Sequence, residues 1–503
     1  MCIKGISSAP DRACVRQPSH LVAKGISFPD VSGDIRADVS TLADEIRQAD
    51  RRIGDTSFFG PDAQIGFGNG PAILLGDTGE IPLMIESGGH HLDYRLGWLA
   101  RSGDLVVIGG LVSPAFEAYQ KRILGEGGID YLHVPEAGNG LRKPTPVICL
   151  RNQNVYRQLL NKVRQGGGAT LVAHITTGSI WALATRLGRD TNLPIHVAGP
   201  PAVLSRRVNN KLWFGSVCTR LLGADTTPPK REAWSVSTLT RHVAELACRW
   251  DRLVVKVPDS AGSAGNVVLD SKIIRQLCPV DLYHKIRRDL SVRGLRYPPF
   301  QVAVEAWDVN ALTSPSVQIW IPGASNAAPV IEGIYEQVLE GDDHAFAGAL
   351  QAKLPDRIGQ VLSSGAMQLA LLFQELGYYG RCSFDAIVSG GNPDNAKVHW
   401  IECNGRWGGV SIPMTLVNRL SPPGLRPFHA IIHKSGLSFR PRHFNAVLEE
   451  FADLAPASDR KSGVLFLSPN LIEDGAGCNF LSLGKTRQAA ISQSELVVER
   501  LLS

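Results

Sequence analysis

Short apolar runs separated by segments of helical spacing recur between residues 70 and 205, and this alternation constrains the fold more than any other feature of the chain. The apolar runs are Ala72–Leu75, Leu105–Ile108, Tyr131–Val134, Leu171–Ile175 and Ile195–Val197. Helical periodicity appears between several of them, for example at Val155–Arg164 and Ile180–Leu187. Strands that alternate with helices form parallel sheets covered by helices. We therefore predict a Rossmann-like α/β domain here.

The turn after the first of these runs resembles a nucleotide-binding turn only in part. Gly76–Gly79 follows Ala72–Leu75 but lacks the full GxGxxG spacing. The next segment, Ile81–Ile85, has the composition of a second strand and not of a helix. We interpret the turn as a hairpin turn between two strands.

Length and composition limit the class of protein. A chain of 503 residues is expected to form several domains of roughly 100–200 residues each. With 44% hydrophobic and 20% charged residues, a folded globular protein is expected. The net charge of +5 is small for this length, so the strongly basic face of a nucleic-acid-binding protein is not indicated. A mild positive balance would suit an anionic substrate.

Cysteine usage favours a reducing compartment, and the distribution of apolar residues predicts no membrane span. The nine cysteines are odd in number and no two have CxxC spacing, which argues against a disulfide framework or a zinc cluster. The first 14 residues include Lys4, Asp11 and Arg12 and no apolar run, so we expect no signal peptide. No run of about 18 apolar residues predicts a membrane span. We expect a cytoplasmic protein without nucleic-acid or membrane partners.

The pattern changes after residue 205, and four segments are predicted. Residues 1–68 form an N-terminal extension with one helix near Ile35–Ile53, and residues 69–205 form the Rossmann-like domain. Residues 206–440 form a second, α+β domain. Residues 441–503 form a small C-terminal domain, in which we predict two strands and a helix at Gly463–Leu467, Phe480–Leu483 and Gln493–Leu502.

A lysine stands near the end of a predicted strand, before a loop of small residues. The strand is Leu253–Val257, which contains Lys256, and the loop runs from Ser260 to Gly265. Backbone N–H groups of such a loop can turn inward and cradle a phosphate, and the lysine would add a positive charge. A flexible hairpin with a solvated lysine would give the same pattern, so this segment alone leaves both interpretations open.

Two acids follow another predicted strand. The apolar run Gln301–Val304 leads into Glu305, and Asp308 lies three residues further on. The backbone of an extended linker can hydrogen-bond an adenine edge, and acids can accept ribose hydroxyls. Acids at a strand end are also common on any protein surface, so this segment is not specific by itself.

The most informative polar residues lie on two apolar strands joined by a polar turn, Gly390–Asn395, which predicts a hairpin. Asp385 lies on the first strand. Glu402 and Asn404 lie two apart on the second strand and share one face, whereas Cys403 between them points to the opposite face and is interpreted as a core residue.

Folding this hairpin would bring two carboxylates and one amide together. Asp385, Glu402 and Asn404 form a hard-oxygen set of the kind that holds Mg²⁺ bridged to phosphates. Acids between apolar neighbours are unfavourable without a cation or a partner. Arg406, two residues further on, could neutralise a transferred phosphoryl group or hold a carboxylate. A solvent-facing hairpin with salt bridges is the alternative, and the clustering of acids in apolar strands disfavours it.

Taken in this order, the segments resemble the ATP-grasp superfamily over roughly residues 205–420. The resemblance begins with Lys211 on a predicted helix that ends at Gly223, and continues with Lys256 and its small-residue loop. It ends in Glu402-Cys403-Asn404-Gly405-Arg406, which is similar to the family's Glu-x-Asn-x-Arg signature. The spacing of 45 residues between the two lysines is typical of the family.

The resemblance implies a site for ATP and for one or two Mg²⁺ ions, with Mn²⁺ as a substitute. Its implied assignments are Lys211 and Lys256 at the phosphates; Ser260, Gly262, Ser263 and Gly265 in the loop that closes over them; Glu305 and Asp308 at adenosine; Asp385, Glu402 and Asn404 at the metal; and Arg406 and Lys256 as catalytic residues. The loop has fewer glycines than many in the superfamily, so its role is carried over but not the contact of each residue.

The flanking domains narrow the resemblance. A Rossmann-like pre-ATP-grasp domain before the grasp domain and a small domain after it are similar to the pheganomycin-type peptide ligases. That similarity implies a carboxylate–amine ligase acting through an acyl-phosphate with release of ADP and phosphate, in peptide natural-product biosynthesis. Amino acids or peptides would be the substrates, and a homodimer is allowed. The alternatives are other ATP-grasp chemistry, namely a phosphotransferase or carboxylase, and a nucleotide-binding module without catalysis.

Overall fold

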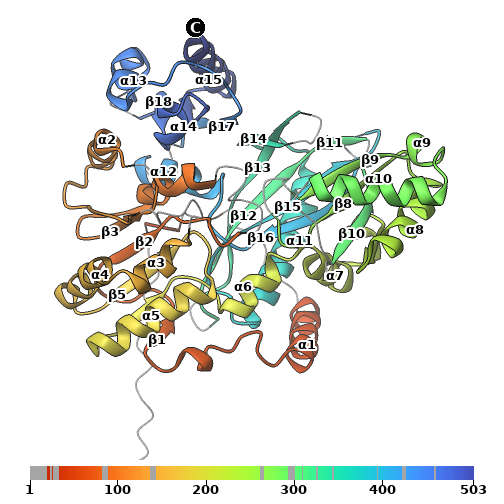
Figure 1. Cartoon of the computed structure of the whole chain (residues 1–503), viewed down its shortest axis with the longest axis horizontal. Coiled ribbons are helices and arrows are strands. Elements are labelled where there is room, and N and C mark those ends of the chain that lie inside the picture. Colours follow the sequence, from red (N-terminus) through yellow and green to blue (C-terminus); the bar gives the residue numbers. More distant parts are fainter. Residues whose placement is uncertain are drawn as a thin grey trace, which may run out of the picture.

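The computed structural model describes residues 20–22, 25, 33–81, 89–110, 112–135, 143–260, 265–292, 301–308, 310–324, 327–341, 345–392, 395–421, 426–457 and 460–503. Within these ranges the strands form three sheets. A parallel sheet and a small antiparallel sheet lie on either side of a long central antiparallel sheet (Figure 1).

The first sheet has six strands in the described part of the chain, in the order β1-β6-β5-β2-β3-β4, and every pair is parallel. The strands are β1 (Ala63–Ile65), β2 (Ala72–Leu75), β3 (Leu105–Ile108), β4 (Asp130–His133), β5 (Ala169–Ala173) and β6 (Ile195–Val197). All residues of β2, β3 and β5 are buried, as expected for strands with both faces covered. The strands predicted between residues 70 and 205 are therefore confirmed.

The hairpin interpretation of Gly76–Gly79 is wrong. Strand β2 pairs in parallel with β3 on one side and with β5 on the other, so neither edge of β2 is left for an antiparallel partner that follows it directly. Residues 82–85 of the predicted second strand lie outside the described residues. Because the chain places β3 and β4 on one side of β2 and then returns to add β5 on the other, the sheet order reverses between β2 and β5.

Helices cover this sheet and connect its strands. They are η1 (Ser57–Phe59), η2 (Gly89–Leu99), α2 (Pro114–Leu124), α3 (Thr145–Arg151), α4 (Gln153–Gly166), α5 (Gly178–Thr191) and α6 (Ala202–Val208). Strand β1 belongs to the segment predicted as an N-terminal extension, yet it extends the sheet at its edge. The predicted helix of that segment is present as α1 (Gly33–Ala49), whose buried side chains pack against α11 (Asp356–Glu375).

The second sheet forms a separate lobe with the order β7-β10-β8-β9. Its elements are β7 (Lys230–Ala233), α8 (Val236–Ala247), β8 (Arg252–Lys256), β9 (Asn266–Asp270), α9 (Ser271–Ile274), α10 (Pro279–Val292) and β10 (Val302–Ala306). Helix α7 (Lys211–Leu222), followed by η3 (Ala224–Thr226), leads into this lobe, and α7 has the bounds predicted from the sequence. The sequence did not predict α10.

The central sheet is antiparallel, with nine strands in the described residues. Its strands are β11 (Ala311–Thr313), β12 (Pro315–Ile321), β13 (Val330–Glu340), β14 (Ala345–Gln351), β15 (Gly380–Ser389), β16 (Lys397–Asn404), β17 (Phe428–Ser435), β18 (Gly463–Phe466) and β19 (Gly477–Gly484). The order is β11-β15-β12-β13-β14-β17-β19-β18, and β16 pairs with β15, so the predicted hairpin is confirmed.

The last segment of the chain shares this sheet. Strands β18 and β19, from the predicted small C-terminal domain, add to β17 and do not form a sheet of their own. The helices of this part are α12 (Ser411–Leu420), α13 (Phe444–Glu450), η5 (Ala452–Leu454), α14 (Asn470–Glu473) and α15 (Arg487–Leu502). Among the described residues, no helix has the length and apolar character that crossing a bilayer requires.

Candidate active site

The β15–β16 hairpin places the three predicted metal ligands together. Asp385 lies opposite Glu402, and Ser383 opposite Asn404, so the side chains of these pairs share one face of the sheet. The Asn404 side-chain amide donates a hydrogen bond of 2.9 Å to Asp385 Oδ2. Cys403, which points the other way, is 2% exposed and belongs to the core, as predicted.

Strand β12 supports Asp385 from its other side. Ser316 lies opposite Asp385 and donates a hydrogen bond of 2.5 Å to Asp385 Oδ1. Gln318 in turn donates to Ser316 Oγ at 2.8 Å. Neither residue was predicted as part of the site. Two polar side chains at alternating positions in an otherwise apolar strand indicate buried polar groups that need partners, and this pattern could have identified them.

Two lysines face these acids. Lys211 is the first residue of α7, whose N-cap Asn210 accepts backbone hydrogen bonds from Leu212 and Trp213. Its ammonium group lies 3.0 Å from Glu402 Oε2 and also donates to the Ser260 carbonyl oxygen. Lys256, at the end of β8, lies 2.6 Å from Glu305 Oε2 on the neighbouring strand β10.

Burial and opposed charges shift the pKa values of the two carboxyl groups in opposite directions. Burial raises the pKa of Asp385, and the negative charge of Glu402 raises it further. Burial would also raise the pKa of Glu402, but the positive charges of Lys211, Arg406 and Lys256 outweigh it and the pKa is lowered. The pair therefore concentrates negative charge that a cation would stabilise.

Arg406 is held by residues from two elements. Its guanidinium donates to the side-chain oxygens of Asn404 and Asn209, and Asn209 Oδ1 also accepts the backbone N–H of Gly405 at 3.1 Å. A Cβ added at Gly405 would lie 2.4 Å from Val208 Cγ2, so only glycine fits in this turn. Burial lowers the pKa of Arg406, against the opposing charge of Glu402. Asn209 was not predicted, and no local sequence pattern marks it.

The small-residue loop is described only at its two ends. Ser260 is buried and approaches Lys211, and the Gly265 carbonyl accepts the Val257 N–H at 3.1 Å. A Cβ added at Gly265 would lie 2.3 Å from Ser260 Oγ, so the close return of the loop requires glycine there. Gly262 and Ser263 lie outside the described residues.

Asp308 lies apart from the lysines. It accepts from Ser389 Oγ at 3.4 Å, and its other carboxylate oxygen is 2.9 Å from His399 Nδ1 on β16. The structure thus brings together Lys211, Ser260, Asp385, Glu402, Asn404 and Arg406, with Lys256 and Glu305 adjoining through the β8–β10 pair. Asp308 instead contacts His399, which lies on the same strand, β16, as Glu402 and Asn404.

The three predicted metal ligands include an amide and are not three His, Cys, Asp or Glu side chains. No group of three His, Cys, Asp or Glu side chains in the described part of the chain is placed to hold a metal ion. The cluster offers two carboxylates and the Asn404 amide oxygen instead, all of them hard oxygen donors of the type that Mg²⁺ prefers.

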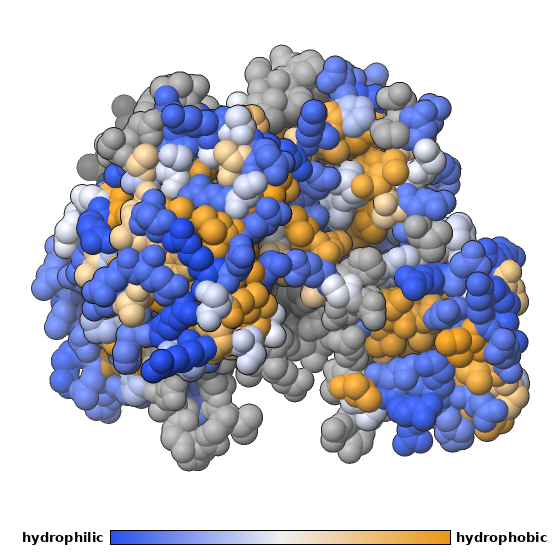
Figure 2. Space-filling view, turned by 90° about the horizontal axis from the view of Figure 1, so that it is seen from above, coloured by the Kyte–Doolittle hydropathy of each residue, from blue (hydrophilic) through white to orange (hydrophobic). Residues whose placement is uncertain are grey.

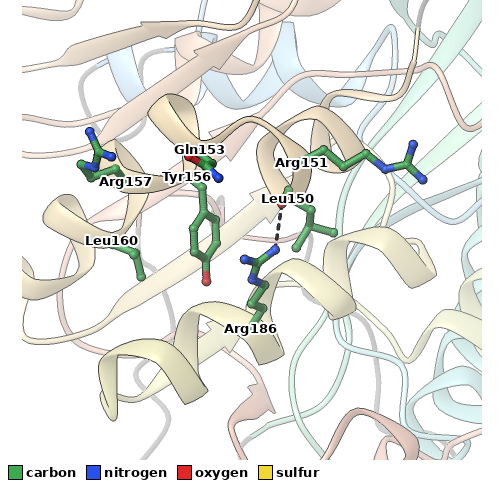
Figure 3. Close-up of a pocket in the computed structure, with 7 residues that line it drawn as sticks. All are labelled: Leu150, Arg151, Gln153, Tyr156, Arg157, Leu160 and Arg186. Atoms are coloured by element: carbon green, nitrogen blue, oxygen red, sulfur yellow. Dashed lines mark hydrogen bonds between the residues drawn. The ribbon is translucent and has the colours of Figure 1, made fainter.

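Two surface hollows lie elsewhere. One, of about 360 Å³, lies over α3, α4 and α5, where Tyr156 stands against Arg186 and Arg186 donates to the Leu150 carbonyl (Figure 3). The other, of about 550 Å³, lies by α8, α9 and α10 and is lined by both apolar and polar residues. Figure 2 shows apolar side chains on the surface of the lobe at the right, the side on which Figure 1 shows these helices. Neither contains a residue of the charged cluster.

Comparisons with known proteins agree with this architecture. Residues 93–189 match the family model of the pre-ATP-grasp domain. An ADP complex of N5-carboxyaminoimidazole ribonucleotide synthetase is similar over 86% of this chain and 98% of its own, with 12% identity and a TM-score of 0.52.

A second similar structure is N5-carboxyaminoimidazole synthase from Aspergillus clavatus with ADP and 5-aminoimidazole ribonucleotide. It covers 86% of this chain and 99% of its own, at 13% identity and a TM-score of 0.50. No curated protein matches the sequence. At these identities the likeness concerns the fold, and the predicted fold class, a pre-ATP-grasp domain preceding an ATP-grasp fold, is confirmed.

Proposed function

We propose that this chain is an ATP- and Mg²⁺-dependent ligase that joins a carboxylic acid to an amine through an acyl-phosphate. The observation that carries the proposal is the direct opposition of Asp385 and Glu402 on paired strands, surrounded by Lys211, Lys256 and Arg406. The two acids would bind a divalent metal ion, and the three cations would bind the negative charges of a polyphosphate.

The residues present fit the metal. Asp385, Glu402 and Asn404 would hold Mg²⁺, and all their donor atoms are oxygens. Burial and the like charge of Glu402 raise the pKa of Asp385, and a bound cation would oppose both effects. Bound there, Mg²⁺ would neutralise phosphate charge. Lys211 and Lys256 now contact Glu402 and Glu305 and would exchange these partners for phosphate oxygens.

In the proposed reaction an oxygen of the substrate carboxylate attacks the γ-phosphorus of ATP, and the bond to the leaving ADP oxygen breaks. The amine then attacks the acyl-phosphate carbonyl, phosphate leaves, and the amine nitrogen loses a proton. Arg406, held by Asn209 and Asn404, is placed to stabilise the negative charge that develops. The loop from Ser260 to Gly265 would exclude water from the acyl-phosphate.

We further propose that the substrates are amino acids or short peptides, as in peptide natural-product biosynthesis, and that the domains divide near residues 68, 205 and 440. A cytoplasmic location and a homodimer belong to the same proposal. Its support is the sequence resemblance to pheganomycin-type ligases together with the match of residues 93–189 to the pre-ATP-grasp domain.

The test is incubation with ATP, Mg²⁺ and a pool of amino acids and short peptides, with mass spectrometry of the products. ADP, phosphate and a new amide are the expected products. AMP and pyrophosphate would contradict the acyl-phosphate, and a carboxylated or phosphorylated product would favour the alternative ATP-grasp chemistries.

A matched pair of variants tests the site within the same assay. Glu402→Ala should lower ATP turnover by about 10³-fold. Glu340→Ala removes an acid of the same sheet that forms only an exposed pair with Lys434, and it should leave turnover unchanged. An unchanged rate in Glu402→Ala would exclude the metal assignment.

A further inference from the structure

Arg95 is a buried cation with no counter-charge among the residues that the structure describes. It lies on η2 of the pre-ATP-grasp domain, is 3% exposed, and forms no ion pair with any residue that the structure describes. Its Nη2 donates to the Gly409 carbonyl oxygen at 2.8 Å, and its Nε is buried without a hydrogen-bond partner. Burial lowers the pKa of Arg95 to about 10, so it remains charged at neutral pH.

A charged group in this position is unfavourable for the fold alone. An uncompensated buried charge is strongly destabilising, which is why buried cations are normally paired. The other fully buried arginine of this region, Arg381, follows that rule and is paired with Glu332. The missing negative charge beside Arg95 therefore points to a ligand.

The surroundings of Arg95 connect it to the candidate active site. Gly409 lies three residues after Arg406 and immediately before α12, whose N-cap residue Val410 provides no side-chain cap. Helix η2 packs against α12, so Arg95 lies at the amino end of that helix, where the helix dipole favours an anion.

The charges of both arginines act on a buried histidine, His174. The His174 carbonyl accepts the Trp407 N–H at 2.9 Å, which fixes the end of β5 against the turn that follows Arg406. Burial, together with the positive charges of Arg406 and Arg95, lowers the pKa of His174 to about 3. The histidine is therefore neutral and provides neither a counter-charge to the arginines nor a positive charge for an anion. It also lies at the carboxyl end of β5, beside the point where the order of the parallel sheet reverses.

We propose that Arg95, with the amino end of α12, binds a carboxylate group of a substrate next to Arg406. The inference rests on the proposed ligase function and adds the substrate group that the pre-ATP-grasp domain recognises. That carboxylate is either the one that becomes activated or a second carboxylate on the amine partner. The planar guanidinium can bind either one through two parallel hydrogen bonds.

The experiment compares wild type with Arg95→Met, Arg95→Lys and the control Arg157→Met, which removes an exposed arginine of α4. ADP release is measured with Mg²⁺-ATP and the free-acid amino acids and peptides that wild type uses. Arg95→Met should raise the KM for the carboxylate-bearing substrate by about 10- to 100-fold. Arg95→Lys should recover part of this, and the control should match wild type.

The two sources of the carboxylate are separated by which KM changes. If the activated acid is bound, its KM rises and the KM of the amine partner does not. If a second carboxylate is bound, the KM of the amine partner rises, and wild type alone discriminates against the C-terminally amidated form of that partner. Either result supports the proposal, whereas unchanged KM values for both substrates in Arg95→Met would overturn it.

Thermal unfolding separates binding from a structural role. Removing an unpaired buried charge should leave the Tm of Arg95→Met equal to or above that of wild type. A lower Tm, with both KM values unchanged in the surviving protein, would mean that Arg95 only supports the fold.

A failure of the proposed function can be told apart from a failure of this inference. If wild type releases no ADP with any substrate pool, the ligase proposal fails. The subsite is then tested by Tm shifts with the free-acid peptide pool and with its amidated counterpart. A shift produced by free acids alone and lost in Arg95→Met supports the subsite, and an equal shift in both proteins excludes it.

Discussion

The segment Arg381–Asp385 of strand β15 has a charged residue at each end, on the same face of the strand, and the two charges are compensated differently. We call the Arg381 end closed and the Asp385 end open. Arg381 and Asp385 are four residues apart, and their partners across β12 are Trp320 and Ser316. At the first end the Arg381 and Glu332 side chains are 1% and 0% exposed and form a direct ion pair. At the second end two acids face each other, and the Glu402 side chain is 23% exposed.

At the closed end, the positive charge of Arg381 is compensated by residues of the protein itself. The Arg381 guanidinium pairs with Glu332, donates to the Leu21 carbonyl at 2.7 Å, and lies 5.4 and 4.9 Å from the ring centroids of Trp320 and Trp407. At the open end two acids of the same sign lie opposite each other, and Lys211 lies 3.0 Å from Glu402. Burial of charge alone therefore does not identify a site, whereas two like charges placed opposite each other indicate one.

The largest effect is expected from Asp385→Asn, which keeps the shape of the side chain and removes one of the two like charges. ATP turnover should fall by about 10³-fold, because a proposed metal ligand loses its charge. The Tm should change little, since the lost charge was opposed by Glu402. Turnover and Tm are measured on the same preparation. A large decrease in Tm would mean that Asp385 stabilises the fold, as Arg381 does at the closed end.

Arg381→Met should instead destabilise the fold by about 3–5 kcal/mol, because it removes the buried guanidinium that pairs with Glu332. Adding Glu332→Gln should restore part of this loss, as expected for two residues in direct contact. Urea unfolding of the single and double variants measures both values. Strictly additive losses would show that the two side chains do not act as a pair.

A neutral buried group provides an intermediate case. His429 on β17 lies 2.9 Å from Tyr335 Oη and 3.2 Å from the Pro427 carbonyl, and burial lowers its pKa from 6.5 to about 4. Between these values the unfolded chain binds a proton that the folded protein does not. The free energy of unfolding should therefore decrease as pH falls from 6.5 to 4, by up to roughly 3 kcal/mol. Unfolding midpoints across this range should depend less on pH in His429→Gln, and an equal slope would refute the assignment.

The smallest effect is expected where a pair is exposed. Lys434 and Glu340 lie 2.7 Å apart, with side chains 27% and 51% exposed. Lys434→Met should change the free energy of unfolding by less than about 1 kcal/mol, because water screens both charges. Thermal unfolding at low and high salt measures this. An effect as large as that of Arg381→Met would mean that exposure does not separate the two kinds of pair.

The sequence by itself determined the local elements and the local chemistry. Strands β2 to β6 of the parallel sheet, the bounds of α7 and the β15–β16 hairpin follow from periodicity and turn composition, which act over a few residues. Strand β1 was not predicted. The shared face of Glu402 and Asn404 also follows, because side chains alternate along a strand. Helix α10 was not predicted. Gly76–Gly79 was misinterpreted because strand partners are determined by the whole sheet and not by neighbours in sequence.

The tertiary structure alone decided which distant residues complete the site. Asn209 meets Arg406 across 197 positions and Arg95 meets Gly409 across 314, distances over which no sequence pattern carries information. The same holds for the addition of β18 and β19 to the central sheet. The physical reason is that hydrogen bonds and ion pairs require contact within a few ångströms, and only the packing of separate elements brings such groups together.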